Sequence, residues 1–297
     1  MRVGIVVPQG WTGEFEGLSP RESWQRAEDA AKRAERLGFE SIWLFDHMHT
    51  TPDPRDVPSL ESFTALSALA AVTNRVRLGH LVACASYRNP GLLAKMISTM
   101  DAVSDGRMEC GLGAGWKAEE WEAYGYPFPE TKARLKHLEE TLEIVTRMLH
   151  QPGRATFKGE TASVDGAINE PRPVQDHLPV LVGGNGRNVT WRLAARFADE
   201  LNLDAMPAAE WAEGGRPDLN RRCEEVGRDP ATLRVSVHLW WQHVDEAPDR
   251  AAFLRGYADA GIDRVMTLVR GAATDLDELD RFAEDCRAAG LELGPAN

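Results

Sequence analysis

The sequence predicts an α/β fold, a (β/α)8 TIM barrel, from three observations. Short apolar runs rich in Val, Leu and Ile alternate with helical patterns along the whole chain, and eight of each can be distinguished. The apolar runs are continuous, which is typical of parallel strands that are buried on both faces. The connections are mostly short, and eight such units close most naturally into a barrel. A doubly wound open sheet is the alternative architecture. We expect residues 1–297 to form a single domain.

The expected elements follow one another in regular alternation. The expected strands are Arg2–Val7, Glu40–Phe45, Val76–Ala83, Arg107–Leu112, Pro179–Val182, Asp199–Leu203, Leu233–Trp240 and Asp263–Val269. The expected helices are Pro20–Leu37, Ser59–Val72, Pro90–Val103, Thr131–Leu149, Arg187–Phe197, Ala208–Val226, Pro248–Ala260 and Leu276–Ala289. The first helix has a complete start signal, since Ser19, Pro20 and Glu22 supply an N-cap, a proline at the first helical position and a capping-box carboxylate. Gly38 then predicts a left-handed end to this helix.

Residues 151–178 interrupt the alternation before the fifth expected strand. The segment contains several prolines and glycines and two short alternating pieces at Thr156–Phe157 and Ala162–Val164. This pattern predicts an inserted excursion with a small hairpin. Long loops in compact domains are often lids or binding loops, so the insertion is a candidate contributor to the site.

The composition narrows the classes of function. The formal net charge is −12, and no Lys/Arg run is long enough to follow a nucleic-acid backbone or an anionic membrane. No stretch reaches the roughly 18 apolar residues of a membrane span. Arg2–Pro8 has the pattern of a strand and not of a basic segment followed by an apolar run, so we do not expect export. The cysteines are far apart and form no Cys-x-x-Cys pair, so we expect free thiols and a cytoplasmic location. They are Cys84, Cys110, Cys223 and Cys286.

Two of the expected strands run directly into glycine-rich turns. One is residues 107–116 (RMECGLGAGW) and the other is residues 179–186 (PVLVGGNG). Glycine lets the backbone approach an anion closely, and the start of a following helix offers unpaired N–H groups and the positive end of its dipole. A tight strand-to-helix turn also needs glycine for steric reasons alone. Two such turns in a regular α/β array favour a phosphate-bearing cofactor.

In a barrel of this kind the active site lies at the carboxyl ends of the strands. Asp46 and His47 follow the second expected strand, and a carboxylate beside an imidazole can orient a proton donor or bind a heterocycle. A helix-capping aspartate beside a structural histidine is the alternative. His47 and His49 also have the spacing of a metal site, but the fifth strand end offers glycine and asparagine in place of a third ligand. Further candidates at strand ends are Cys84, Tyr87, Glu119, Glu120, Arg187, Asp204, His238 and His243.

Some charged and aromatic side chains are expected inside the barrel or at its mouth. Arg77 and Glu109 stand two residues before a glycine on neighbouring strands, and buried charges are tolerated chiefly when paired. We predict a structural salt bridge between them. Four tryptophans fall on the site face and can wall a flat aromatic ligand. They are Trp11, Trp116, Trp240 and Trp241, whereas Trp24, Trp43 and Trp191 are expected to fill the core or cover helices.

Several longer segments together resemble a known family. They are Gly38–His47 (GFESIWLFDH), Arg75–Gly79 (RVRLG), Asp105–Trp116, and Val182–Gly186 (VGGNG) with residues 194–201 behind it. In this order they resemble the luciferase-like monooxygenase superfamily, and within it the branch of F420-dependent oxidoreductases. The resemblance covers nearly the whole chain. It implies a (β/α)8 barrel with an insertion before the fifth strand, often a homodimer, with a flavin or deazaflavin in its mouth.

The resemblance also implies which residues contact the cofactor. Asp46 would lie near the ring system, and a non-proline cis peptide, which we place at Leu81–Val82, would lie in a bulge behind it. The residues implied are Asp46, His80, Leu81, Val82, Gly113, Ala114, Gly115, Trp116, Gly183, Gly184, Asn185 and Gly186, the last four at the phosphate. The sugar-phosphate dehydrogenases of the family carry a glutamate where this chain has Trp116, so their substrate is not transferred. Phosphate-binding lysines are not evident, although Arg88 and Arg187 can serve an anionic group.

These implications lead to one expected function and three alternatives. We expect an F420-dependent oxidoreductase that passes a hydride between the deazaflavin and a small organic substrate, with no metal. His47, steadied by Asp46, is expected to supply the accompanying proton. An FMN-dependent monooxygenase would instead use reduced flavin and oxygen in the same barrel. A metal-dependent hydrolase would use His47 and His49, and a flavin-binding carrier or sensor would bind the cofactor without turnover.

Overall fold

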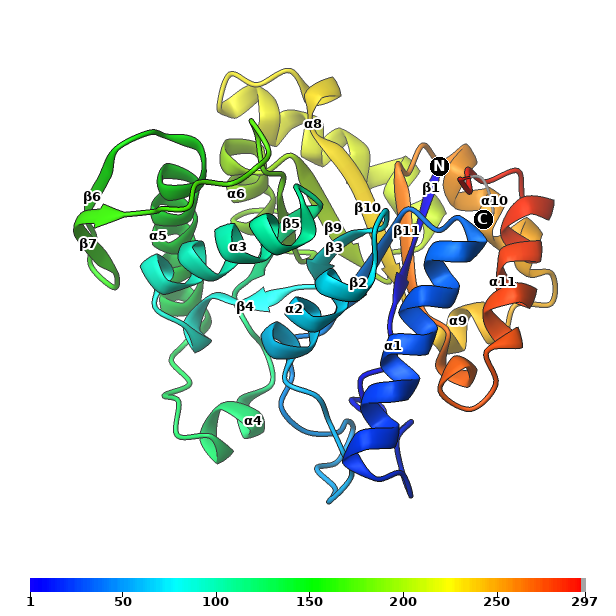
Figure 1. Ribbon diagram of the computed structural model, residues 1–297. Coiled ribbons are helices and arrows are strands. Elements are labelled where there is room, and N and C mark those ends of the chain that lie inside the picture. The colour runs from blue at the N-terminus through cyan, green and yellow to red at the C-terminus, as the bar shows by residue number, and fades with distance from the viewer. Residues whose placement is uncertain (295–297) are drawn as a thin grey trace.

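The computed structural model describes residues 1–294 and shows a closed barrel of parallel strands surrounded by helices (Figure 1). The barrel strands are β1 (Arg2–Val6), β2 (Ser41–Leu44), β3 (Arg77–His80), β4 (Ala83–Cys84), β5 (Met108–Gly113), β8 (Val180–Gly183), β9 (Glu200–Asp204), β10 (Arg234–Leu239) and β11 (Arg264–Leu268). Their order is β3-β2-β1-β11-β10-β9-β8-β5-β4, and an additional pairing of β3 with β5 closes the ring. The predicted (β/α)8 barrel is therefore confirmed.

The helices cover the outside of the barrel. They are α1 (Pro20–Leu37), α2 (Ser62–Val72), α3 (Pro90–Ser104), α4 (Ala118–Ala123), α5 (Thr131–His150), α6 (Thr190–Phe197), α7 (Ala208–Glu210), α8 (Arg216–Glu225), α9 (Trp241–Asp245), α10 (Arg250–Asp259) and α11 (Asp277–Ala288). Short turns of 3₁₀ or π helix are η1 (Ala85–Tyr87), η2 (Trp211–Gly215), η3 (Pro230–Thr232) and η4 (Arg270–Ala273). Helix α1 starts at the predicted capping box, in which Ser19 and Glu22 bond each other's backbone N–H groups, and Gly38 ends it with φ of 91°.

Most expected elements differ from the structure by only one or two residues at their ends, and four differ by more. Helix α2 begins at Ser62 instead of residue 59, because the Glu61 carboxylate caps it by accepting two backbone N–H bonds. The third expected strand is interrupted after His80, where the Leu81–Val82 peptide bond is cis as the family resemblance implied, and the chain resumes as β4. Helix α6 begins three residues later than expected. The helix expected over residues 208–226 is divided by the π turn η2, and α4 and α9 lie in segments expected to be loops.

The expected insertion contains a two-stranded antiparallel hairpin, β6 (Arg154–Lys158) and β7 (Ser163–Ile168), which is longer than the sequence indicated. The hairpin stands at the edge of the molecule beside α5 in Figure 1, and its tip borders a second cavity together with Tyr87 and Arg88. Glu140 of α5 holds its tip, since this carboxylate accepts backbone N–H bonds from Glu160, Thr161 and Ala162 at 2.7 to 2.9 Å.

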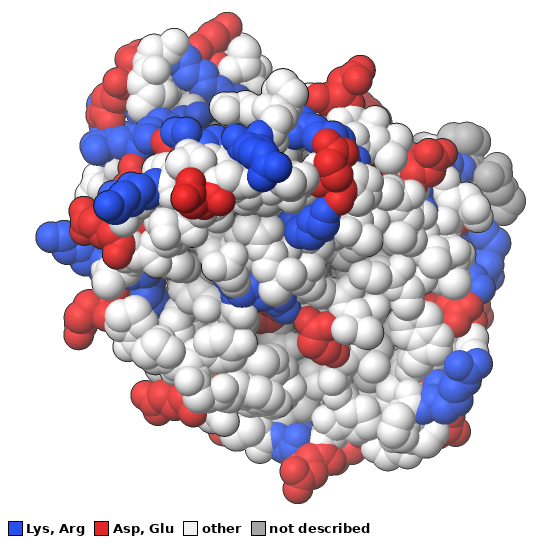
Figure 2. Space-filling view, turned by 60° about the vertical axis from the view of Figure 1, so that its left-hand side comes forward, with Lys and Arg blue, Asp and Glu red and all other residues white. Residues whose placement is uncertain are grey.

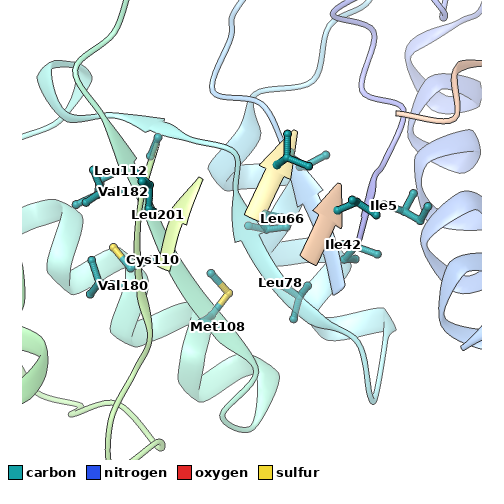
Figure 3. Packing of buried hydrophobic residues seen from close by; sticks show 14 of the residues in the cluster. Ile5, Ile42, Leu66, Leu78, Met108, Cys110, Leu112, Val180, Val182 and Leu201 are labelled. Atoms are coloured by element: carbon teal, nitrogen blue, oxygen red, sulfur yellow. The ribbon is translucent and has the colours of Figure 1, made fainter. Parts of the chain in front are cut away.

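Alternate side chains of each strand enter two separate apolar cores. Those pointing outward, such as Ile42, Leu78 and Met108, pack against helices (Figure 3). Those pointing inward form a smaller cluster in the barrel that includes Trp43 and Met266. This division follows from the two-residue period of a strand. Trp43 and Trp191 are buried and Trp24 is half-buried against the outer core, as expected.

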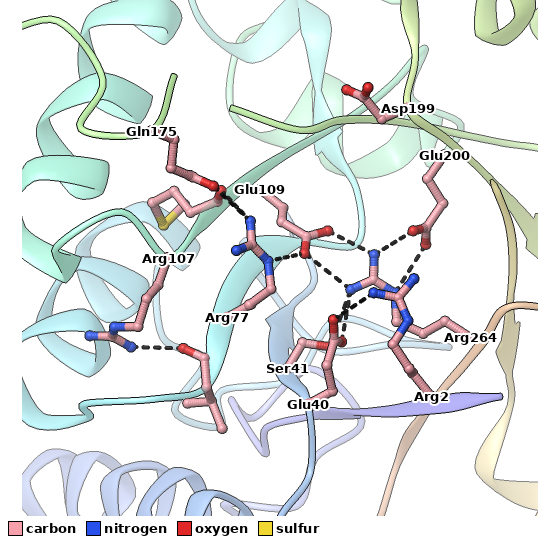
Figure 4. A network of polar contacts seen from close by, with 12 residues as sticks. Arg2, Glu40, Ser41, Arg77, Arg107, Glu109, Gln175, Asp199, Glu200 and Arg264 are labelled. Carbon is pink, nitrogen blue, oxygen red and sulfur yellow. Dashed lines mark hydrogen bonds and ion pairs between the residues drawn. The ribbon is translucent and has the colours of Figure 1, made fainter. Parts of the chain in front are cut away.

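The amino end of the barrel interior is filled by an ion network centred on Arg264 (Figure 4). The Arg264 guanidinium is fully buried and lies 2.7 Å from Glu109, 2.5 Å from Glu200 and 3.0 Å from Glu40. Arg77 donates from Nε to Glu109 at 2.5 Å, so the predicted salt bridge is confirmed. Burial would raise the pKa of the Glu109 carboxyl, but the guanidinium groups of Arg264 and Arg77 hold that pKa well below its usual value.

Candidate active site

A cavity of about 540 Å³ opens at the carboxyl ends of the strands. In Figure 1 this end of the barrel faces downward, where α4 and the loop after β2 extend. The predicted cofactor residues that line the cavity are Asp46, Leu81, Val82, Gly113, Ala114, Gly115, Trp116, Gly183, Gly184 and Asn185. His47 lines it as well. The cavity also includes Tyr87, Lys117, Trp121, Thr190, Asn202, Asp204 and His238, to which the sequence assigned no cofactor contact.

His47 is oriented by Glu120. The His47 Nδ1 atom lies 2.8 Å from Glu120 Oε2, and the same carboxylate accepts backbone N–H bonds from Met48 at 2.7 Å and His49 at 3.3 Å. The Tyr87 hydroxyl donates to it at 3.1 Å. An ionised, acceptor-only partner places the His47 proton on Nδ1 and leaves Nε2 as the nitrogen available to a ligand.

Glu120 is suited to this position because it stays ionised although it is fully buried. Burial alone would raise its pKa, but the hydrogen bond and charge of His47 and the backbone donors of Met48 and His49 lower the pKa below its usual value. The short helix α4 carries Glu120 back toward the loop after β2. The sequence placed Glu120 only among the general candidates at strand ends, because nothing local indicates that α4 folds in this way.

Asp46 has a different partner from the one expected. It does not contact the His47 ring but forms two hydrogen bonds with Arg88, at 2.7 and 3.1 Å, and accepts from the Ser62 hydroxyl and the Cys84 backbone N–H. Burial would raise the Asp46 pKa, and the Arg88 charge lowers it below the usual value. The expectation that Asp46 steadies His47 is therefore wrong. Asp46 instead ties β2 to β4 and α2.

Glycine-rich turns form one side of the cavity, which we call the glycine wall: Gly113–Gly115 after β5 and Gly183–Gly186 after β8. Gly115 and Gly184 have positive φ values of 77° and 134°. Among the described residues, neither Asn185 nor Gly186 has a hydrogen-bonded partner for its backbone N–H. Free backbone donors in a glycine turn just before α6 are suited to an anion.

Val82 packs against the inner face of the glycine wall and itself lines the cavity. A Cβ atom added at Gly113 would lie 2.6 Å from Val82 Cγ2, and one added at Gly183 would lie 2.9 Å from Val82 Cγ1. Both distances are too short for real side chains, so glycine is required at the two strand ends while Val82 occupies this place.

Aromatic rings form the facing side, which we call the aromatic wall: Trp11, Phe45, His47, His238 and Trp240. Trp11 stacks on His47 with ring centroids 4.4 Å apart and planes within 6°. The atoms Trp11 Nε1 and His238 Nε2 are buried and have no hydrogen-bonded partner in residues 1–294. His238 Nδ1 lies 3.3 Å from Asp204 Oδ1.

Several predicted site residues are not themselves lining residues of the cavity. The His80 ring points to the helix layer and stacks on Phe63 at 3.9 Å. Gly186 ends the glycine wall next to the lining residue Asn185, and a Cβ atom added there would lie 2.7 Å from Thr190 Oγ1. Trp241 lies outside the lining as well, although it packs against Trp240. These side chains were misplaced because strand parity and the turn of α9, which the sequence does not indicate, decide which way they face.

The cationic side chains considered for an anionic ligand are already paired. Arg88 binds Asp46 and Glu61, and Arg187 binds Glu210 and Asp218 at 2.7 and 2.9 Å. For metal binding, His49 Nδ1 lies 3.0 Å from the Thr50 carbonyl oxygen, so the His47 and His49 rings engage different partners. Within residues 1–294 no three His, Cys, Asp or Glu side chains are grouped to hold a metal ion.

Charges of both signs are mixed over the face drawn in Figure 2, and a broad part of it is uncharged. No helix in the described part of the chain is long and apolar enough to cross a bilayer.

Comparison with known proteins places this barrel and cavity in a family. The family model described as luciferase-like monooxygenase matches residues 1–292. The chain belongs to the luciferase-like monooxygenase family. The resemblance found in the sequence is thereby confirmed, and the protein is an enzyme.

Individual members of the luciferase-like monooxygenase family differ in the activity their names give. An F420-dependent glucose-6-phosphate dehydrogenase of Intrasporangium calvum is 32% identical over 261 residues, which are 79% of this chain and 74% of the relative. The pyrimidine monooxygenase RutA of Rhizobium rhizogenes is 28% identical over 205 residues, 67% of this chain and 56% of the relative. The solved structure of an F420-dependent secondary alcohol dehydrogenase with an F420-acetone adduct superposes with a TM-score of 0.80 at 19% identity, covering 97% of this chain and 98% of the other.

Proposed function

We propose that this luciferase-like protein is an F420-dependent oxidoreductase that transfers a hydride between the deazaflavin and a small organic substrate, at a C=C, C=N or C=O group or the corresponding alcohol. The observation that carries the proposal is the pairing of free backbone N–H groups on the glycine wall with an oriented histidine across the cavity. The relative named as an F420-dependent dehydrogenase supports this choice of cofactor.

The residues present fit such a cofactor. The N–H groups of Asn185 and Gly186 can bind a phosphate, and glycine at positions 113 and 183 leaves room for the Val82 side chain. The buried, unpartnered Trp11 Nε1 and His238 Nε2 offer further polar atoms to a bound molecule. When bound in its reduced form, F420 supplies the hydride.

The chain's own contribution to the reaction is placement and proton handling. His47, held by Glu120 and stacked on Trp11, presents Nε2 toward the reacting atoms and gives or takes the proton that accompanies the hydride. Asp46 keeps Arg88 and the β4 segment in place beside the bulge. Leu81, Val82 and Trp116 exclude water from the ring of the cofactor.

A side-by-side titration with F420 and FMN tests the proposal. Fluorescence quenching of each cofactor is followed as purified protein is added. We expect micromolar or tighter binding of F420 and binding of FMN at least tenfold weaker. The opposite preference would contradict the deazaflavin assignment.

An FMN-dependent monooxygenase is the second candidate, favoured by the relative named as a pyrimidine monooxygenase. Oxygen uptake separates the two activities, because a deazaflavin does not activate oxygen. Consumption of oxygen by the FMN-loaded protein in the presence of reductant and substrate would establish the second candidate.

The family resemblance also predicts a homodimer, and the widely spaced cysteines predict a cytoplasmic location. Light scattering of the purified protein checks the first, and cell fractionation checks the second. A monomer at micromolar concentration would contradict the predicted assembly.

A further inference from the structure

The aromatic wall and the glycine wall come from opposite halves of the barrel. In the ring of strands β10, β11, β1 and β2 are consecutive, whereas β5 and β8 are neighbours on the other side. The aromatic wall follows the first group and the glycine wall follows the second. The inference below rests on the proposed function, because a cofactor phosphate at the glycine wall leaves the aromatic wall for the substrate.

The rings of the aromatic wall form one connected surface. Trp11 lies 5.6 Å from Trp240 and 4.6 Å from Phe45, measured between ring centroids. His238 meets Phe45 and Trp240 edge-on at 5.2 and 4.9 Å. Aromatic surfaces of this kind bind flat unsaturated groups through stacked and edge-to-face contacts. A puckered, hydroxyl-rich molecule would leave its polar groups unpaired against these rings.

Two buried polar atoms of the aromatic wall have no hydrogen-bonded partner among the described residues. Trp11 is 2% exposed and His238 is 5% exposed, and among the described residues Trp11 Nε1 and His238 Nε2 bond to nothing. The indole N–H of Trp11 can only donate. A ligand with a carbonyl oxygen supplies the acceptor that this donor lacks.

The cavity has no free cation for a phosphate group on the substrate. Lys117 is the only lysine or arginine of the described residues that line it. Its Nζ atom donates to the Thr50 carbonyl oxygen at 3.1 Å and lies 3.8 Å from Glu119. Asp204 adds a carboxylate beside His238. A phosphate dianion would therefore lose its hydration without gaining an unpaired positive charge.

We propose that the aromatic wall binds a flat, uncharged, conjugated carbonyl compound, with its unsaturated part against Trp240 and its oxygen accepting from Trp11. Reduction of such a compound adds the hydride to the carbon β to the carbonyl and a proton, delivered through His47, to the α carbon. The C=C bond becomes a single bond, and reduced F420 is oxidised by two electrons.

The test compares two probe molecules on the protein loaded with F420. Isothermal titration calorimetry measures the binding of trans-4-phenyl-3-buten-2-one and of glucose 6-phosphate. We expect the enone to bind at least tenfold more tightly. Equal or tighter binding of glucose 6-phosphate, or no binding of the enone, would overturn the inference. Binding of F420 is measured first. If the proposed function is wrong, the protein does not bind F420. If only this inference is wrong, the protein binds F420 but does not bind the enone more tightly than glucose 6-phosphate.

Variants locate the binding to the aromatic wall. Trp240→Leu removes a ring of the wall, and its matched control Trp241→Leu removes the adjacent ring outside the lining. We expect about tenfold weaker enone binding in the first variant and less than twofold change in the control. Trp11→Phe keeps a ring but deletes the donor, and we expect about fivefold weaker enone binding. F420 affinity and the melting temperature are measured for all three variants. Equal enone affinities in the Trp240 and Trp241 variants would overturn the assignment.

Discussion

The two ends of the barrel interior differ in whether their polar groups have partners. At the amino end Arg264, Arg77, Glu109 and Glu200 neutralise one another, and each charge has a partner within hydrogen-bonding distance. At the carboxyl end Trp11 and the turn after β8 have polar atoms without partners in residues 1–294. The same strands therefore carry a fully paired, structural ion network at one end. At the other end they carry a surface whose unpaired polar groups are available to a ligand. Each prediction below tests one side of this comparison.

The largest effect is expected at the amino end. Arg264→Met leaves the buried carboxylates of Glu109 and Glu200 without their shared cation, so we expect the free energy of unfolding to fall by about 3 to 5 kcal/mol. Urea denaturation of the purified protein measures this change. Arg281→Met is the control, because Arg281 is half exposed and pairs only with surface carboxylates, and its stability should hardly change. A loss below about 1 kcal/mol for Arg264→Met would show that the network is dispensable.

The two ends should also respond to acid in different pH ranges. His80, behind the cavity, is buried against Phe63, and burial lowers its pKa from 6.5 to about 4. The unfolded chain therefore takes up this proton first, and stability should fall between pH 6.5 and 4 by up to about 3 kcal/mol at about 1.4 kcal/mol per pKa unit. The lowered pKa of Glu109 contributes stability that is present above about pH 4.5 and is lost only at lower pH.

Unfolding of His80→Leu across this pH range checks the assignment. The variant should lack most of the stability change between pH 6.5 and 4.5 while keeping the steeper loss below it. An unchanged profile in His80→Leu would mean that other groups carry the acid sensitivity.

Glu120→Gln tests the orientation of His47 at the carboxyl end. The amide nitrogen cannot accept the Nδ1 proton, so it favours the wrong tautomer of His47. We expect the turnover number of the F420-loaded enzyme to fall about a hundredfold while cofactor affinity changes less than twofold. Glu119→Gln is the matched control, since Glu119 is adjacent but half exposed. Steady-state kinetics and the pH profile of turnover decide the matter, and equal activities of the two variants would rule out a positioning role for Glu120.

The smallest effect is expected at the glycine wall. The Cβ of Gly183→Ala would meet Val82 at 2.9 to 3.1 Å, so the wall must shift, and we expect about tenfold weaker cofactor binding. Val82→Ala in the same chain should restore most of this affinity, because it removes the clashing methyl groups. Gly256→Ala in α10, where an added Cβ meets nothing within 4 Å, should bind the cofactor like the wild type. Failure of Val82→Ala to rescue binding would contradict the packing argument.

Local chemistry explains what the sequence could predict. Ser19, Pro20 and Glu22 determine the start of α1 through contacts within four residues, and the glycine runs indicated both strand ends that form the glycine wall. The partner of His47 could not be predicted, because Glu120 is 73 residues away and reaches it through α4. Arg264 was not predicted as the centre of the ion network, because its partners are also far away in the sequence. Its position near the start of β11 nevertheless matches the positions of Arg77 in β3 and Glu109 in β5.

Val82 touches the ends of two strands at once, which has a consequence for how this chain can vary during evolution. Positions 82, 113 and 183 are far apart in the sequence, but their side chains would occupy the same limited space. The size of one side chain therefore restricts the size of the other two. A mutation that adds a methyl group at position 113 or 183 becomes acceptable only in a lineage where position 82 has already become smaller. These three positions should therefore change together among descendants of this sequence, and the order of the changes should begin at position 82.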